Sequence, residues 1–232
     1  MLADNLHNVK ETIASALARR AERKETGDEV CLVAVTKNHP AAVVTEIQAL
    51  GVGNIGENRV QEAREKQQQV GHPGKWHLIG HLQTNKVKQV VGKVDLIQSV
   101  DRRNLLEAIN KEAARQNIVQ DILLEINIGN EESKSGFAIE DIHPLLEKIG
   151  DFSAIRIRGL MAIPPICQNS TDNHKFFQEM CKISVDIKAK KYDNVSVEIM
   201  SMGMSDDFAD AIACGSTMIR VGTAIFGPRN YQ

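Results

Sequence analysis

The chain has 232 residues, of which 42% are hydrophobic and 25% charged, a composition typical of a globular protein. Its formal net charge is −2, without the basic footprint of a nucleic-acid-binding protein or the polybasic patch of a membrane-surface protein. No apolar stretch approaches the length of a membrane span, and the N-terminus lacks the apolar core of a signal peptide. The four cysteines lie far apart and form no Cys-x-x-Cys pair. We expect a reduced, cytoplasmic protein that acts as a monomer and binds neither nucleic acid nor membrane.

The expected elements alternate along the chain. A helix is expected over residues 4–24, and the leading segment 1–27 is expected to pack on the rest of the domain. Apolar runs indicate strands at 30–36, 54–56, 76–80, 96–100, 122–128, 155–162, 195–200 and 217–221. Amphipathic patterns indicate helices between them at 41–50, 60–70, 86–91, 103–117, 139–149, 173–190 and 206–214.

Eight strands that alternate with helices are expected in a closed (β/α)8 barrel, or TIM barrel, and also in a long doubly wound sheet. The barrel is favoured because eight units close, with the first strand beside the last. No linker rich in Pro, Gly or Ser interrupts the pattern, and the composition does not shift along the chain. Residues 1–232 are therefore expected to form a single α/β barrel domain.

Lys37 stands at the C-terminal end of the first predicted strand. The preceding residues, 30–35, form a continuous apolar run typical of a strand buried on both faces. In barrels and open α/β sheets, ligands bind at the carboxyl ends of the strands. Desolvation or a nearby cation lowers the pKa of a lysine amine there and makes it a nucleophile toward an aldehyde. The alternative is a solvated loop lysine.

Small and hydroxyl-bearing residues follow the seventh and eighth strands. The seventh ends at Ser201, and Ser205 is expected to be the N-cap of the next helix, with two aspartates in its first turn. The eighth ends in Arg220, before Gly222 and Thr223. In many barrels these two loops cradle a phosphate with backbone N–H groups and a helix N-terminus. Two ordinary capped turns are the alternative.

Alternation places Arg220 on one face of its strand with Met218 and Gly222. A guanidinium inside a barrel needs a partner, and a phosphorylated heterocycle offers an acceptor nitrogen to Arg220 and a phosphate to the loops. With Lys37 on the neighbouring first strand, this combination suggests pyridoxal 5′-phosphate held as a Schiff base. Asn58, after the second strand, either reaches the same mouth or serves as the N-cap of the following helix.

Two further patterns have weaker functional meaning. The glycines at 51, 53 and 56 satisfy G-x-G-x-x-G, but they follow a predicted helix and lead into a strand, the reverse of the dinucleotide-binding order. Gly51 is better interpreted as a helix C-cap. His77 and His81 have a spacing that binds zinc on a helix, but they fall on a predicted strand and turn. No metal site is expected.

Taken together, seven segments resemble the pyridoxal phosphate homeostasis protein family along the whole chain. They are 33–37 (VAVTK), 56–62 (GENRVQE), 76–83 (WHLIGHLQ), 133–136 (SKSG), 158–163 (RGLMAI), 201–206 (SMGMSD) and 220–227 (RVGTAIFG). The resemblance implies an alanine-racemase-like barrel with the cofactor on Lys37 and a role in controlling vitamin B6 supply. It also implies that Asn58 lies near the cofactor, Arg220 near the ring nitrogen, and Ser205, Gly222 and Thr223 at the phosphate.

Three functions compete. The first is a carrier that holds pyridoxal phosphate and releases it to cofactor-dependent apo-enzymes, with no catalytic residue of its own. The second is an amino-acid racemase, which wants an acid–base group on each face of the cofactor. Tyr192 is expected at the wrong end of the barrel, Tyr231 lies in the tail, and no counterpart of the C-terminal domain of the alanine racemases is expected. The third is cofactor-free aldol chemistry on Lys37, with Glu57 as a mouth carboxylate or, equally, a helix first-turn residue. The carrier is favoured.

Overall fold

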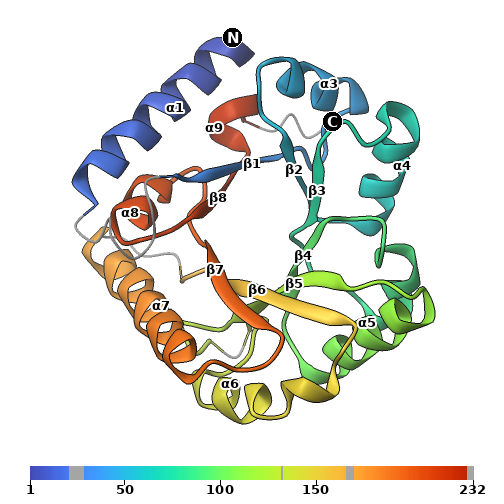
Figure 1. Ribbon diagram of the computed structural model, residues 1–232. Coiled ribbons are helices and arrows are strands. Elements are labelled where there is room, and N and C mark those ends of the chain that lie inside the picture. The colour runs from blue at the N-terminus through green and yellow to red at the C-terminus, as the bar shows by residue number, and fades with distance from the viewer. Residues whose placement is uncertain (21–28, 132, 166–169, 229–232) are drawn as a thin grey trace.

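The computed structural model of the protein describes residues 1–20, 29–131, 133–165 and 170–228. Its parallel strands form a closed barrel in chain order, and the first strand pairs with the last, which confirms the predicted (β/α)8 barrel. Figure 1 looks along the barrel, with the strands in a ring and the helices outside them. The strands are β1 (Cys31–Val35), β2 (Asn54–Glu57), β3 (Lys75–Leu78), β4 (Leu96–Val100), β5 (Gln120–Ile126), β6 (Ile155–Ala162), β7 (Val195–Ser201) and β8 (Met218–Val221).

The helices follow the predicted order, with several differences in extent. They are α1 (Leu2–Arg19), α3 (Ala41–Ala49), α4 (Val60–Val70), α5 (Arg103–Arg115), α6 (Ile139–Leu146), α7 (Ser170–Lys190), α8 (Phe208–Ala213) and α9 (Thr223–Phe226), with the 3₁₀ helices η1 (Thr84–Gln89) and η2 (Ile149–Asp151). The segment predicted as an α-helix at 86–91 is η1, where one buried side chain is too little to hold an α-helix. The helix predicted from residue 206 begins at Phe208. The first helix ends at Arg19, and positions 21–27 of the predicted leading segment lie outside the described residues.

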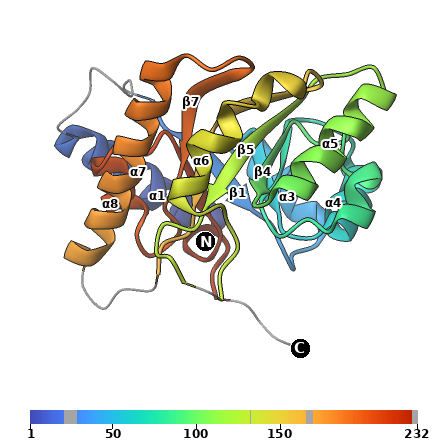
Figure 2. The ribbon, with the colours of Figure 1, turned by 90° about the horizontal axis from the view of Figure 1, so that it is seen from below.

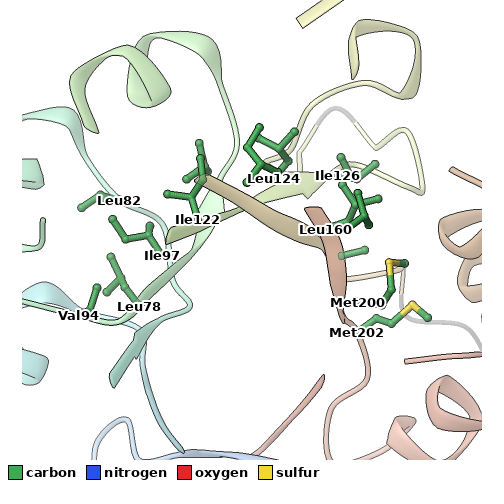
Figure 3. Close-up of a cluster of buried hydrophobic side chains, with 14 of the residues drawn as sticks. Leu78, Leu82, Val94, Ile97, Ile122, Leu124, Ile126, Leu160, Met200 and Met202 are labelled. Atoms are coloured by element: carbon green, nitrogen blue, oxygen red, sulfur yellow. The ribbon is translucent and has the colours of Figure 1, made fainter. Parts of the chain in front are cut away.

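The strands bury both faces, which explains their continuous apolar runs. One apolar cluster fills the inside of the barrel and includes Val33, Leu96, Leu123, Met161 and Met218. A second, larger cluster lies between the barrel and the helices, and Figure 3 shows part of it from Leu78 and Ile97 to Met200. Alternation along each strand separates the two sets, so every second residue points toward the barrel axis. The side chains that point toward the axis continue to the opening at the carboxyl ends of the strands, which we call the mouth.

Helix α1 braces the segments that follow β7 and β8. Its buried residues face α8 and α9, and Figure 2 shows it on the same side of the barrel as α7 and α8. Asn5 Nδ2 donates a hydrogen bond of 2.9 Å to the carbonyl of Ile225, and Arg20 Nε donates one of 2.9 Å to the carbonyl of Ile212. The last strand–helix unit is therefore held in place by the start of the chain.

Candidate functional site at the carboxyl end of the barrel

Lys37 lies just past β1 and is half-buried. The inward set of β1 includes Val33, and alternation carries it through Val35 to Lys37. The turn that follows is fixed by its neighbours, because Asn38 adopts a left-handed φ of 63° and its N–H donates 2.8 Å to Glu62 Oε2. The structure therefore holds the Lys37 segment at the carboxyl end of β1 with its backbone constrained.

Asn58 stands beside Lys37 on the neighbouring strand. The register that pairs Val35 with Gly56 extends to bring residue 58 level with residue 37. Asn58 is not the N-cap of α4, because that position is Arg59. Its Oδ1 is buried and accepts no hydrogen bond in the described part of the chain. An unused buried acceptor at a mouth is a place for a ligand donor, so the structure favours the mouth position over the capping role.

A glycine holds the Asn58 segment close to the next strand. A Cβ at Gly80 would lie 2.3 Å from the carbonyl oxygen of Asn58, closer than any real side chain allows. Only glycine lets the end of β3 pass against the backbone of Asn58 in this way. The three neighbouring loops after β1, β2 and β3 are thus packed tightly against one another.

Beneath these loops lies a buried ion pair. Lys66, on α4, donates 2.6 Å to Glu57 Oε1 and 2.6 Å to the carbonyl of Thr36, and the Thr36 hydroxyl also donates to Glu57 Oε1. Burial raises the pKa of the Glu57 carboxyl, and the Lys66 ammonium acts in the opposite direction. Glu57 is neither a mouth carboxylate nor a helix first-turn residue, because it ends β2 and points toward α4. It fixes the strand ends that carry Lys37 and Asn58.

Arg220 is buried inside the barrel, and its face of β8 is the one that alternation predicted. It pairs with Val33 in register, so it lies deeper than Lys37. Its Nη1 donates 2.8 Å to the Ser201 carbonyl and 2.7 Å to Ser201 Oγ, and its Nη2 donates 3.0 Å to the Ala162 carbonyl. These three acceptors are neutral oxygens. Burial lowers the pKa of Arg220 to about 10, so the guanidinium stays charged at neutral pH.

Two carboxylates influence Arg220 without bonding to it in the described chain. Glu125, on the inward face of β5, is buried, and burial raises its pKa to about 7, with the charge of Asp101 adding to the rise and Arg220 opposing it. Burial likewise raises the pKa of Asp207, which sits at the N-terminus of α8. The buried guanidinium therefore keeps a charge that no direct carboxylate partner neutralises, and it can serve an acceptor on a ligand.

Ser205, Gly222 and Thr223 meet at the start of α9. The Ser205 hydroxyl accepts hydrogen bonds from Gly222 N (3.3 Å) and Ala224 N (3.2 Å). The prediction that Ser205 caps its own helix is wrong, because Asp207 is the N-cap of α8 and takes the Met204 N–H at 2.6 Å. Ser205 instead accepts from two N–H groups at the start of α9. Thr223 is exposed there, and a Cβ at Gly222 would lie 3.3 Å from the Val35 carbonyl oxygen.

Ser201 is brought to the site but not to its surface. Its hydroxyl is fully buried, accepts from Arg220 and donates 2.7 Å to Gln98 Oε1. In the structure it supports the guanidinium from below, and a direct contact with a ligand stays a prediction. Sequence reasoning missed three supporting residues: Lys66, Gln98 and Glu125. Each interrupts an apolar face or run, which is the signal that could have revealed it.

The arrangement fits a small anionic heterocycle. It offers an amine, a charged guanidinium, an unused amide acceptor and a small-residue turn whose N–H groups now bind a serine hydroxyl. The structure also places the two patterns of weaker functional meaning. Gly51, at φ 86°, follows the end of α3 as a C-cap glycine does, and His77 lies on a strand. No cluster of metal-ligating side chains occurs among the described residues, and none of their helices is apolar over a membrane-spanning length.

Known proteins resemble this chain along nearly its whole length. Residues 11–230 match the family model "Alanine racemase, N-terminal domain". A pyridoxal phosphate homeostasis protein of Aquifex aeolicus is 41% identical over 94% of this chain and 96% of its own length, and one of Escherichia coli is 36% identical over 100% and 98%.

Solved structures give the same result. PipY of Synechococcus elongatus, in its form with pyridoxal phosphate bound, matches with a TM-score of 0.80 and 34% identity over 93% of this chain and 100% of that one. An alanine racemase of Clostridium difficile, at 17% identity and a TM-score of 0.68, covers 98% of this chain and 57% of that one, and shares the fold. By its sequence along nearly its full length and by its barrel, the chain belongs to the pyridoxal phosphate homeostasis proteins, within the alanine racemase N-terminal domain family.

Proposed function

We propose that this protein binds pyridoxal 5′-phosphate at the carboxyl end of the barrel, holds it on Lys37 and releases it to cofactor-dependent apo-enzymes. The observation that carries the proposal is the buried Arg220, whose charge has no bonded carboxylate in the described chain. Such a charge is costly unless a ligand uses it. The PLP-bound form of PipY, at 34% identity, supports the choice of ligand. Within the proposal the chain acts as one barrel domain, as a monomer in the cytoplasm.

Each residue of the site then has a definite role. Pyridoxal phosphate supplies an aldehyde that forms a Schiff base with an amine. Lys37 provides that amine, and Arg220 donates to the ring nitrogen. The turn of Ser205, Gly222 and Thr223 receives the phosphate with its hydroxyls and backbone N–H groups, and Asn58 uses its free acceptor near the ring. No residue is assigned a catalytic role.

Borohydride reduction tests the covalent attachment. Protein incubated with pyridoxal phosphate is reduced, digested and mapped by mass spectrometry, with absorbance spectra before and after reduction. We expect the label on Lys37 and its loss in Lys37→Ala. A label confined to Lys86 or Lys134 would overturn the assignment. Lys86, in the exposed helix η1, offers a matched control as Lys86→Ala, which should keep the parent's label.

The phosphate turn is tested by a pair of variants that differ only in charge. Gly222→Glu places a carboxylate where the phosphate is expected, and Gly222→Gln places the same shape without the charge. We expect Gly222→Glu to weaken pyridoxal phosphate binding about 100-fold or more, which is roughly 2.7 kcal/mol, with a smaller loss in Gly222→Gln. Circular dichroism checks that both fold. Binding as tight as in the parent would mean that the phosphate lies elsewhere.

An amino-acid racemase remains the second candidate, and one observation favours it. Glu125 is a buried carboxyl near Arg220 with a pKa of about 7, in the range that acid–base catalysis uses. The deciding measurement is α-proton exchange of alanine in D₂O, run beside cofactor transfer to an apo-transaminase. The carrier proposal expects efficient transfer and slow exchange. Exchange with turnover comparable to ordinary enzymes would instead favour the racemase.

A further inference from the structure

A chain of buried polar side chains runs along the inside of the barrel from Arg220 toward the amino end. Ser201 Oγ lies 2.7 Å from Arg220 Nη1 and 2.7 Å from Gln98 Oε1. Gln98 Nε2 lies 3.0 Å from His77 Nδ1, and His77 Nε2 lies 3.1 Å from Asn54 Oδ1. Five strands contribute one member each, and the first four members are buried beside the apolar cluster inside the barrel.

The donors and acceptors of this chain follow from its first member. An arginine only donates, so Ser201 Oγ must accept and its own proton goes to Gln98 Oε1. The Gln98 amide N–H₂ then faces His77 Nδ1, which must carry the lone pair. The proton of His77 is therefore on Nε2, where it is donated to Asn54. Burial lowers the pKa of His77 to about 4, which keeps the ring neutral at physiological pH, as this order requires.

The side-chain amide of Gln98 is held in one orientation. Its second amide hydrogen points to Met218 Sδ at 3.2 Å, so both hydrogens and the carbonyl oxygen are used. If the amide turned over, Ser201 would face a donor and could no longer both accept from Arg220 and give up its proton. The bond between Arg220 and the Ser201 hydroxyl thus depends on Gln98, and the orientation of Gln98 depends on His77. A polar chain of this kind holds one arrangement only when every member is satisfied.

At the upper end, the chain determines which N–H groups of Arg220 remain for a ligand. Nη1 gives both of its hydrogens to Ser201, and Nη2 gives one to Ala162. In the described residues no bond is assigned to Nε–H or to the second hydrogen of Nη2. These donors remain for an acceptor on a ligand, such as a ring nitrogen.

We propose that Gln98 and His77 are positioning residues for the cofactor, which act by fixing the orientation of Arg220 beneath the ring nitrogen. This inference rests on the proposed function, since it takes Arg220 as the group opposite that nitrogen. Neither residue touches the ligand. Their effect reaches it through Ser201 and Arg220.

The test uses pyridoxal phosphate labelled with ¹⁵N in the ring, whose chemical shift reports the hydrogen bond at that nitrogen. Gln98→Leu removes the two central bonds at similar volume. Met161→Leu is the matched control, because Met161 is also buried inside the barrel but belongs to no bond of the chain. We expect Gln98→Leu to move the ¹⁵N shift toward that of Arg220→Met and to weaken binding roughly 10-fold. Met161→Leu should leave both as in the parent.

A pair of variants at His77 gives a second test. In His77→Gln the amide oxygen can accept from Gln98 and the amide N–H₂ can donate to Asn54, whereas His77→Leu does neither. We expect the parent's ¹⁵N shift in His77→Gln and an altered shift in His77→Leu. Should Gln98→Leu fail to fold, this pair decides alone.

The outcomes separate the inference from the function on which it rests. A ¹⁵N shift that responds to Arg220→Met but to neither Gln98→Leu nor His77→Leu overturns the positioning role and keeps the site. A shift that does not respond to Arg220→Met places Arg220 away from the ring nitrogen and overturns both. Failure of the parent to bind the labelled cofactor at all overturns the proposed function.

Discussion

Lys66 and Arg220 are both buried cations near the mouth of the barrel, and their partners differ. Lys66 meets Glu57 at 2.6 Å, so its charge is neutralised within the protein. Arg220 meets only neutral oxygens in the described chain, with Glu125 and Asp207 acting at a distance. The first cation supports the backbone on which Lys37 and Asn58 stand. The second keeps a charge that a ligand can use, which distinguishes a supporting group from a binding group.

Breaking the Lys66 pair should have the largest effect on stability. Lys66→Met leaves Glu57 buried without its cation, which should lower the free energy of unfolding by about 3–5 kcal/mol. Urea denaturation at pH 7 without cofactor measures the loss. The double variant Lys66→Met with Glu57→Leu removes both charges and should recover most of it. If the double variant is no more stable than the single one, the pair is not the source of the effect.

The pH dependence of the free energy of unfolding should reveal Glu125, the carboxyl group that acts on Arg220 without a direct bond. The pKa of Glu125 rises from 4.5 to about 7 on folding, so the folded state holds an extra proton in that range and loses stability as pH rises through 7. The pKa of His77 falls from 6.5 to about 4, so the unfolded state holds an extra proton and stability is lost as pH falls below 6.5. Between about pH 4.5 and 6.5 the two contributions oppose each other.

Variants that remove Glu125 or His77 one at a time should each show the pH dependence that the other group contributes. In Glu125→Gln only the contribution of His77 remains. The free energy of unfolding should therefore fall by about 3 kcal/mol relative to the parent as pH falls from 7 to 4. His77→Gln leaves Glu125, so it should rise by about 3 kcal/mol as pH falls from 8 to 4.5 relative to the parent. Urea denaturation across this range gives both curves. Parallel curves in the parent and both variants would show that neither group titrates differently on folding.

Removing Arg220 should weaken binding and should cost less stability than removing Lys66. Arg220→Met withdraws a buried charge and leaves the oxygens of Ser201 and Ala162 without donors, a loss of about 1–3 kcal/mol. Pyridoxal phosphate affinity should fall at least about 10-fold, since the ring nitrogen loses its donor. Fluorescence titration and urea denaturation of the same samples check both. A stability loss as large as that of Lys66→Met would remove the distinction between the two cations.

The smallest effect is expected at the turn where Ser205 meets α9. Ser205→Ala removes the acceptor for the N–H groups of Gly222 and Ala224, which should cost about 1 kcal/mol or less, as for a weak helix cap. Because a bound phosphate can satisfy the same N–H groups, saturating pyridoxal phosphate should restore most of the loss. Thermal denaturation with and without ligand measures this. An equal loss in both conditions would mean that the ligand does not use this turn.

The features read correctly from the sequence depend on local patterns. Alternation along β8 placed Arg220 on the same face as Met218, which lies inside the barrel, and the number of strand–helix units indicated closure. The buried supporting residues Lys66 and Glu125 also have signals in the sequence, but an analysis of one element at a time overlooks them. Lys66 falls on the same face of α4 as the buried Val60 and Ala63, and Glu125 interrupts the apolar run of β5.

Other features depend on contacts between distant segments and could not be read locally. Ser205 has the sequence context of a cap for its own helix, yet it caps α9 across the neighbouring loop. The hydrogen-bond chain of Gln98 and His77 joins five strands, and no one of them shows it. Glu57 has the pattern of a helix first turn, and its role became visible only when the position of Lys66 was known.

Closure of the barrel also determines when the site comes into existence. The pairing of Val33 with Arg220 joins segments near the two ends of the described chain, and the rings of His39 and Phe226 lie 5.0 Å apart where the first and last loops meet. Contacts of such long sequence separation form late in folding. Until β8 pairs with β1, Arg220 is not held beside the strand that leads to Lys37. Ligand added during refolding should therefore bind only in the final phase and stabilise the closed ring, which makes cofactor capture a direct reporter of complete folding.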